Sequence, residues 1–172
     1  AYEIYGSDWS SDVCSSICSG GLSVAAGAVQ MGARVVLLEG HKMGGDCLNY
    51  GCVPSKALLA AASVAHAQGG NAAMGVGPGQ ATINYGAAKE FVDSVIGQIA
   101  PHDSVARFEG LGVTVIEDFG RFTSPTEVQA GNRVVTARRI VIATGSSPFV
   151  PPIPGLRELS QYTNSTIFEV FV

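Results

Sequence analysis

Charge is scarce in this 172-residue chain. Charged residues make up 14% of it, against roughly 25% in an average soluble domain, and 10 Lys and Arg are outnumbered by 14 Asp and Glu. No basic cluster exceeds Arg138-Arg139, which argues against a nucleic-acid-binding protein. Because hydrophobic residues reach 47%, the composition also excludes a disordered tail.

Targeting and membrane signals are missing as well. The first Lys or Arg is Arg34, so the chain lacks the positive amino-terminal region of a secretory signal. The most membrane-like stretch, residues 20–38, contains Gln30 and Arg34, and its Gly-Ala pattern suits a helix, a turn and a strand better than a lipid-facing span. Four cysteines are too few for a disulfide-stapled secreted scaffold of this length. We therefore expect a cytoplasmic protein that does not enter a membrane.

Glycine, by contrast, is abundant, with 22 residues among many Ala and Val. This composition favours the close helix–sheet packing of an α/β nucleotide-binding fold. Helices are predicted over residues 22–31, 47–67 and 85–111, the last broken at Pro101. Buried strands are predicted over 34–39, 113–117 and 139–143, with short antiparallel strands around Phe122, Val128 and Val134-Val135 that turn at Gly131-Asn132.

Residues 1–18 do not fit this pattern. Ser7 to Ser16 is a polar run with neither an apolar period nor a strand signature. It resembles translated sequencing-library adapter. We therefore interpret residues 1–18 as an anomalous, artefactual segment, followed by a domain over residues 19–150 and a proline-rich linker over 151–172.

The most specific pattern opens the second predicted helix and runs Gly44-Gly45-Asp46-Cys47-Leu48-Asn49-Tyr50-Gly51-Cys52-Val53-Pro54-Ser55-Lys56. Cys47 and Cys52 would point apart on an ideal helix, so a bond between them needs a distorted first turn. Gly51 and Pro54 supply that irregularity. A helix amino terminus and the charge of Lys56 both favour a thiolate. These are the needs of a dithiol that cycles between reduced and oxidised forms, and the alternative is a pair of structural cysteines in a Gly-rich turn.

Two further positions fit a dinucleotide site. Glu39 ends a predicted strand, where an acid can hydrogen-bond the ribose hydroxyls of a dinucleotide; a solvated acid at a strand end is the alternative. The strand over 139–143 runs into Ala143-Thr144-Gly145-Ser146, a turn that lets the backbone approach a cofactor closely. An ordinary strand-to-loop glycine is the alternative there.

Together these motifs resemble the class I pyridine nucleotide–disulfide oxidoreductase family, over about residues 19–172, and most of all its mercuric-reductase-like and dihydrolipoamide-dehydrogenase-like members. The resemblance implies an incomplete α/β fold: a Rossmann-like FAD-binding domain made of a parallel sheet with helices plus a small antiparallel β meander. That domain would cover residues 19–150, and residues 151–172 would lead to a missing NAD(P)-binding domain.

The resemblance also implies roles for individual residues. Cys47 would be the interchange thiol that meets the substrate, Cys52 the thiol that faces the flavin, and Lys56 a positive charge near the reactive flavin nitrogen. The implied cofactor-binding residues are Gly20, Gly21, Glu39, Gly45, Asp46, Lys56, Gly120, Ala143, Thr144, Gly145 and Ser146. No metal ligand is implied among them.

The implied activity is electron transfer from NAD(P)H through FAD to a Cys47–Cys52 disulfide, and on to a small-molecule disulfide or metal-ion substrate. NAD(P)H would bind through the missing domain. The parent enzyme would be a homodimer, and the fragment itself is not expected to turn over.

The phosphate-binding loop departs from the family. The pattern Gly-x-Gly-x-x-Gly, aligned on Gly21, requires glycine at positions that hold Ser16 and Cys18. A Cβ at either position would obstruct the tight turn or the pyrophosphate. We expect the strand before this loop to be lost as well.

Two other functions stay open. One is a non-enzymatic module in which Cys14, Cys18, Cys47 and Cys52 bind zinc or a soft metal. The other is a dithiol-independent FAD oxidoreductase or a simple dinucleotide-binding domain.

Overall fold

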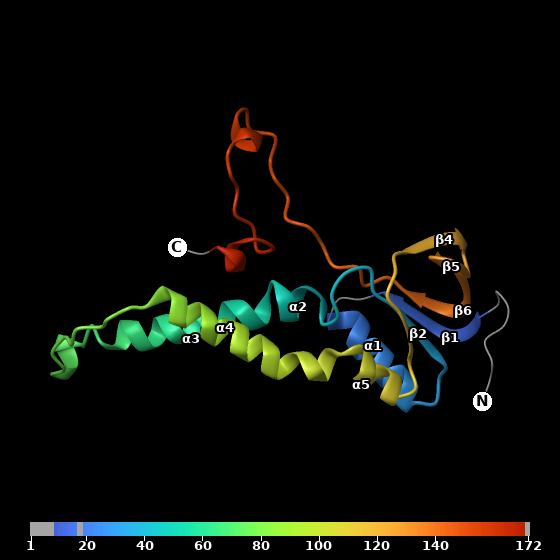
Figure 1. Ribbon diagram of the computed structural model, residues 1–172, viewed down its shortest axis with the longest axis horizontal. Helices are drawn as coiled ribbons and strands as arrows, with labels where there is room; N and C mark the ends of the chain where they lie inside the picture. The colour runs from blue at the N-terminus through green and yellow to red at the C-terminus, as the bar shows by residue number, and fades with distance from the viewer. Residues whose placement is uncertain (1–8, 17–18, 171–172) are drawn as a thin grey trace. The chain divides into compact units, whose positions relative to one another are not determined.

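A computed structural model shows a mixed α/β chain (Figure 1) and describes residues 9–16, as backbone, and residues 19–170. The described residues form two compact units. The first contains the residues up to Gly45 together with Ala100–Ser146, and the second contains Asp46–Ile99 together with the residues from Ser147 onwards. The sheet therefore belongs to the first unit and the Cys47–Cys52 pair to the second.

One six-stranded sheet, in the order β3-β2-β1-β6-β5-β4, forms the first unit. The strands β3, β2, β1 and β6 run parallel, and β6, β5 and β4 form an antiparallel meander. This arrangement confirms the predicted incomplete Rossmann-like fold with an added meander. Their bounds are β1 Trp9–Ser16, β2 Val35–Leu38, β3 Thr114–Ile116, β4 Gly120–Ser124, β5 Glu127–Ala130 and β6 Arg133–Val141.

The segment in which the sequence shows no strand signature is a strand at the centre of the sheet. Strand β1 pairs in parallel with β2, where Ser16 lies opposite Leu38, and with β6, where Ser15 lies opposite Val141. The predicted loss of this strand was therefore wrong. Its backbone is hydrogen-bonded from both sides, and this pairing outweighs the weak strand propensity of a polar run. The expected obstruction by Cys18 lies outside the described residues.

Strand β6 unites two strands that the sequence analysis placed separately, around Val134-Val135 and over 139–143. Its first half pairs antiparallel with β5, from Ala130 opposite Arg133 onwards. The part of β6 from Val135 to Val141 also pairs in parallel with β1. One long strand therefore joins the meander to the parallel sheet, and the predicted Ala143–Ser146 turn follows its end.

Apolar side chains cover both faces of the parallel sheet. All four residues of β2 are buried, as expected of a parallel strand between layers. Side chains from α1 (Ser19–Gln30) and α5 (Val105–Gly110) pack on one face, where Phe108 is almost completely buried. A second cluster joins β2 and β3 to β5 and β6, and includes Leu38, Ile116, Val128 and Val135. The core thus holds the parallel strands and the meander in one sheet.

Helices make up most of the second unit. The helix predicted over 47–67 is two helices, α2 (Gly45–Asn49) and α3 (Cys52–Ala67), because the chain breaks at Tyr50-Gly51. Helix α4 (Tyr85–Ile99) lies beside α3 (Figure 1). Short 3-10 turns are Ala72–Met74, Ala100–Asp103, Leu156–Glu158 and Ile167–Glu169. The turn at Ala100–Asp103 separates α4 from α5, which confirms the predicted break at Pro101. No helix in the described ranges has both the length and the hydropathy that a membrane crossing requires.

Gly120 allows β4 to begin close to the core. An added Cβ would lie 2.8 Å from Leu38 Cδ1 and 3.0 Å from Val128 Cγ1. Gly120→Ala should therefore lower the free energy of unfolding by about 1–3 kcal/mol, the usual effect of overpacking, in urea denaturation followed by circular dichroism.

Gly27→Ala is the matched control. On α1 the added Cβ meets nothing within 4 Å, so the higher helix propensity of alanine should raise stability by about 1 kcal/mol. Equal stability of the two variants would show that β4 has room for a side chain at position 120.

Candidate functional site

The carboxyl ends of the parallel strands meet at one edge of the sheet in the first unit. Ser16 of β1 pairs with Leu38 of β2, which in turn pairs with Ile116 of β3, and β6 ends beside β1. Ligands of open α/β sheets bind outside the carboxyl ends of the strands. The segments that follow these strand ends carry the predicted cofactor-binding residues of this unit, namely Gly20, Gly21, Glu39, Gly45, Gly120, Ala143, Thr144, Gly145 and Ser146.

Glu39 follows β2 directly and is a buried acid, with 6% of its surface exposed. Its Oε1 accepts a hydrogen bond from the backbone N–H of His41 at 2.7 Å. Its buried Oε2 has no hydrogen-bond partner within the described part of the chain. Such an acceptor carries a desolvation penalty of about 1–3 kcal/mol, so a hydroxyl donor from a ligand would fit it. The ribose of a dinucleotide offers such hydroxyls.

Burial is the main electrostatic influence on this carboxyl. It raises the pKa of Glu39, and repulsion from Glu117 adds to the increase. The backbone hydrogen bond from His41 and the charge of the His41 ring oppose it. The net result is a carboxyl that holds its proton more tightly than an exposed glutamate does.

Glycines shape the turns beside the predicted cofactor site. Gly44, Gly45 and Gly145 have φ values of 88°, 59° and 70°, a region that side chains with a Cβ rarely adopt. Gly20 lies in the first turn of α1, where an added Cβ would meet nothing within 4 Å. Gly120 is needed for a different reason, because an added Cβ there would come too close to Leu38 and Val128. The turn after β6 and the turn before α2 therefore need glycine for their backbone conformation.

The helix break positions the two cysteines. Cys47 lies in α2 and Cys52 is the first residue of α3, and both are free thiols. Gly51 caps α3, and an added Cβ there would lie 3.0 Å from the Asp46 carbonyl oxygen and 3.4 Å from the Cα of Cys47. The glycine thus permits a close approach of α2 to the start of α3. This close approach brings the side chains of Cys47 and Cys52 into hydrogen-bond contact.

The protonation of Cys47 differs from the sequence-based expectation. The side-chain hydrogen bond with Cys52 raises the pKa of Cys47, and partial burial raises it further. The backbone N–H of Cys52 and the positive charge of Lys56 act in the opposite direction but do not outweigh the first two. The expected lowering of the thiol pKa is therefore not found at Cys47, where the hydrogen bond to Cys52 and burial have the larger effect.

Asp46 and Lys56 flank the cysteine pair in the second unit. Lys56 is exposed on α3, one turn beyond Cys52. Asp46 Oδ1 accepts a hydrogen bond from Asn164 Nδ2 at 3.2 Å, so the predicted linker contacts the residue next to Cys47. Asn164 was not predicted from the sequence, because nothing in a polar run indicates a partner 118 positions away.

The four-cysteine metal site has no support in the described residues. No group of three or more His, Cys, Asp or Glu side chains there could hold a metal ion. The side chains of Cys14 and Cys18 lie outside the described part.

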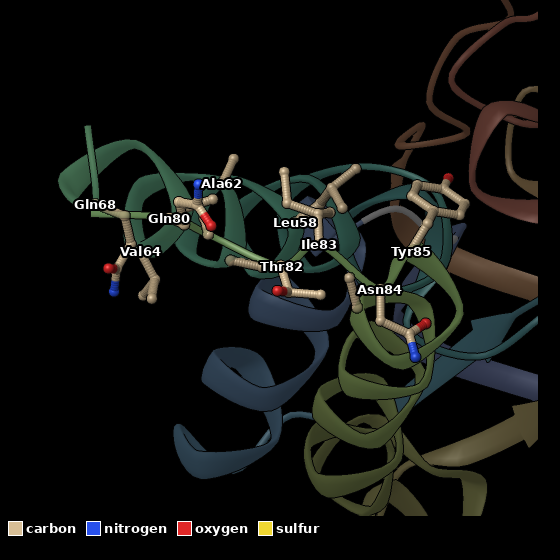
Figure 2. A pocket seen from close by; sticks show the side chains of 13 residues that line it. Leu58, Ala62, Val64, Gln68, Gln80, Thr82, Ile83, Asn84 and Tyr85 are labelled. Carbon is tan, nitrogen blue, oxygen red and sulfur yellow. The ribbon is translucent and has the colours of Figure 1, made fainter. Parts of the chain in front are cut away.

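A groove of about 630 Å³ lies in the second unit, between α3 and the segment that leads into α4. Figure 2 shows Leu58 of α3 close to Ile83, with Gln68, Gln80 and Tyr85 along the same groove. None of the predicted site residues lines it.

The chain belongs to the pyridine nucleotide-disulphide oxidoreductase family, which matches residues 18–170. It is 36% identical over 167 residues to the mercuric reductase of Shigella flexneri, covering 87% of this chain and 28% of that protein. It is 38% identical over 169 residues to the mercuric reductase of Acidithiobacillus ferrooxidans, covering 87% and 29%. It is 36% identical over 141 residues to the dihydrolipoyl dehydrogenase of Acholeplasma laidlawii, covering 81% and 41%.

A solved structure agrees with the fold. The Cu(II) complex of the HOCl-induced flavoprotein disulfide reductase RclA from Escherichia coli matches with a TM-score of 0.74 at 21% identity, over 92% of this chain and 33% of that one. The chain spans between 25% and 41% of the length of the curated relatives it matches. The predicted family and fold class are thus confirmed.

Replacing Glu39 with glutamine should stabilise the chain at neutral pH, by about 1 kcal/mol, because it removes the charge from a buried carboxyl group whose Oε2 has no hydrogen-bond partner. The folded chain binds the Glu39 proton more tightly than the unfolded chain does. The contribution of Glu39 to stability is therefore complete below the ordinary glutamate pKa and is lost as the pH rises through the raised pKa. The stability of the Glu39→Gln variant should not fall in this way as the pH rises.

Urea denaturation across this pH range measures the difference between the two chains. Glu109→Gln, at an exposed position on α5, is the control and should change stability by less than about 0.5 kcal/mol at each pH. A wild-type chain that becomes more stable relative to Glu39→Gln as the pH rises would contradict the raised pKa.

Removing Cys52 should lower the pKa of the Cys47 thiol, because its hydrogen bond to Cys52 is the main cause of the increase. The rate of iodoacetamide alkylation of Cys47, followed against pH by peptide mass spectrometry, reports this pKa. Cys52→Ala should shift the profile to lower pH than in the wild-type chain. Lys56→Met should shift it to higher pH, since the lysine charge lowers the pKa. A shift in the same direction for both variants would exclude this account.

Proposed function

We propose that this chain is the FAD-binding, dithiol-bearing part of an oxidoreductase that passes electrons from NAD(P)H through FAD to a Cys47–Cys52 disulfide. The observation that carries the proposal is the contact between the two cysteines across the break at Tyr50-Gly51. A straight helix would hold residues at this spacing apart. The break therefore allows the two sulfurs to come close enough to form a bond.

Several residues of the first unit fit FAD. The unpaired Oε2 of Glu39 suits a ribose hydroxyl. The amino terminus of α1 at Gly20-Gly21 suits a phosphate group, and the positive-φ turn at Gly145 suits close backbone contact. FAD, when bound, supplies a two-electron carrier between a nicotinamide and a dithiol.

The two cysteines would carry the exchange with substrate. Reduction of the internal disulfide breaks the S–S bond with two electrons and two protons and gives two thiols. Cys47, once deprotonated, attacks a disulfide substrate and forms a mixed disulfide, while one substrate sulfur leaves as a thiol. Cys52 then attacks the Cys47 sulfur, releases the second substrate thiol and restores the internal disulfide. Lys56 eases the first step, since its charge lowers the pKa of Cys47.

The substrate class follows from the relatives. Two of them are named for mercuric ion and one for the dihydrolipoyl group, so we propose a small disulfide or a soft metal ion. We further propose a cytoplasmic, homodimeric parent enzyme that uses NAD(P)H through a further domain. The 172 residues alone are not expected to turn over.

We assign residues 19–150 to the FAD-binding domain and residues 151–172 to the linker. Residues 1–18 we regard as foreign in sequence even though residues 9–16 take the place of the central strand β1, and the family match, which begins at residue 18, supports this. Sequencing the genomic DNA across codons 1 to 20 tests the assignment. A native coding sequence without interruption there would overturn it.

Anaerobic titration tests the dithiol. The oxidised wild-type chain, saturated with FAD, should take up two more electrons per chain from dithionite than Cys47→Ser/Cys52→Ser, because a disulfide couple carries two electrons. Absorbance spectroscopy follows the flavin, and peptide mass spectrometry follows the disulfide. Cys14 and Cys18 are present in both chains, so they do not contribute to the difference. Equal electron uptake by both chains would refute the redox pair, and failure of the wild-type chain to bind FAD would refute the cofactor.

A further inference from the structure

One side chain of the segment that follows β6 contacts the cysteine pair's own part of the second unit. Asn164 Nδ2 donates a hydrogen bond to Asp46 Oδ1 at 3.2 Å, although 118 positions separate the two residues. Both residues belong to the same compact unit. Because Asp46 directly precedes Cys47, this hydrogen bond ties Asn164 to the short helix that carries one of the two sulfurs.

The backbone of Asp46 forms one side of the helix break. Its carbonyl oxygen accepts a hydrogen bond from the Tyr50 N–H at 2.8 Å, and a Cβ added at Gly51 would lie 3.0 Å from the same oxygen. Helix α2 has five residues, of which Leu48 is buried. A helix that short is not stable in water by itself. Helix α2 therefore depends on contacts with other segments to hold Cys47 in place.

The turn that carries Asn164 is fixed by hydrogen bonds of its own. The Thr163 N–H donates to Thr166 Oγ1 at 3.0 Å. The N–H groups of Thr166 and Ile167 both donate to the Thr163 carbonyl oxygen, at 3.0 Å and 2.8 Å. Since this turn is folded, binding of the Asn164 amide to Asp46 costs less conformational entropy than it would from a flexible linker.

We propose that Asn164 is a positioning residue for the dithiol: by holding Asp46 it fixes α2 and keeps the Cys47 sulfur within reach of the Cys52 sulfur. The inference rests on the proposed redox function of this pair. When glutathione disulfide oxidises the pair, the two thiols lose two electrons and two protons and form one S–S bond, and two glutathione thiols are released. An α2 that is already fixed loses less conformational freedom in this step, so the contact favours the disulfide.

A glutathione redox titration of the 172-residue chain tests the inference without FAD. The chain is equilibrated in buffers of oxidised and reduced glutathione, quenched with acid, alkylated with N-ethylmaleimide and cut with trypsin. The tryptic peptide 43–56 contains Cys47 and Cys52 and no other cysteine. The alkylated thiols on this peptide, counted by mass spectrometry, give the equilibrium constant of the disulfide and hence the reduction potential of the pair.

Asn164→Ala should lower this equilibrium constant about two- to five-fold, the effect of losing one exposed hydrogen bond to a carboxylate. Asn164→Asp should lower it further at neutral pH, because it sets a second carboxylate against Asp46. In an Asp46→Ala chain, Asn164→Ala should have no additional effect. A residue that only stabilised its own segment would act equally in both chains, so the double-mutant cycle isolates positioning through Asp46.

Asn132→Ala is the matched control, since it removes an exposed asparagine of the first unit and should leave the equilibrium constant unchanged. An equilibrium constant that Asn164→Ala leaves unchanged or raises would overturn the inference. So would an equal effect of Asn164→Ala with and without Asp46, and either result leaves the proposed function standing. A wild-type chain that forms no Cys47–Cys52 disulfide in any of the buffers would refute the proposed redox pair as well.

Discussion

The parallel pairing of β1 with β2 and β6 brings together the segments of the first unit that carry the candidate cofactor-binding residues. With β1 in the middle, the ends of β2 and β6 are brought to one edge, and the start of α1 follows at the same edge. Glu39, Gly145 and Gly20 share that edge only because these three strands are in register. The meander beyond β6 extends the sheet without altering the edge.

Stability and the proposed binding of a ribose oppose each other at Glu39. A leucine or an exposed acid at the end of β2 would avoid an unpaired buried oxygen. The chain instead keeps a buried carboxyl whose pKa burial raises. Groups that destabilise the protein without ligand and favour its bound form are typical of sites that are formed before the ligand arrives.

The motifs with strict backbone requirements could be predicted from the sequence, and the contacts that depend on tertiary pairing could not. The glycines and the Cys-x-x-x-x-Cys pattern were enough to predict the family. The cysteine spacing also predicted a distorted helix turn, and the structure has its helix break at Gly51. The strand character of Trp9–Ser16 was not predictable, because it comes from neighbours and not from its own residues. The pKa of Cys47 was missed for the same reason: a hydrogen bond between two side chains outweighs a general rule about helix ends.

The interruption at Tyr50-Gly51 has a mechanical consequence. Helix α2 has five residues and α3 has 16, so the two sulfurs sit on bodies of very different size. The proposed Cys47–Cys52 disulfide would therefore join a helix of little more than one turn to a helix of more than four turns.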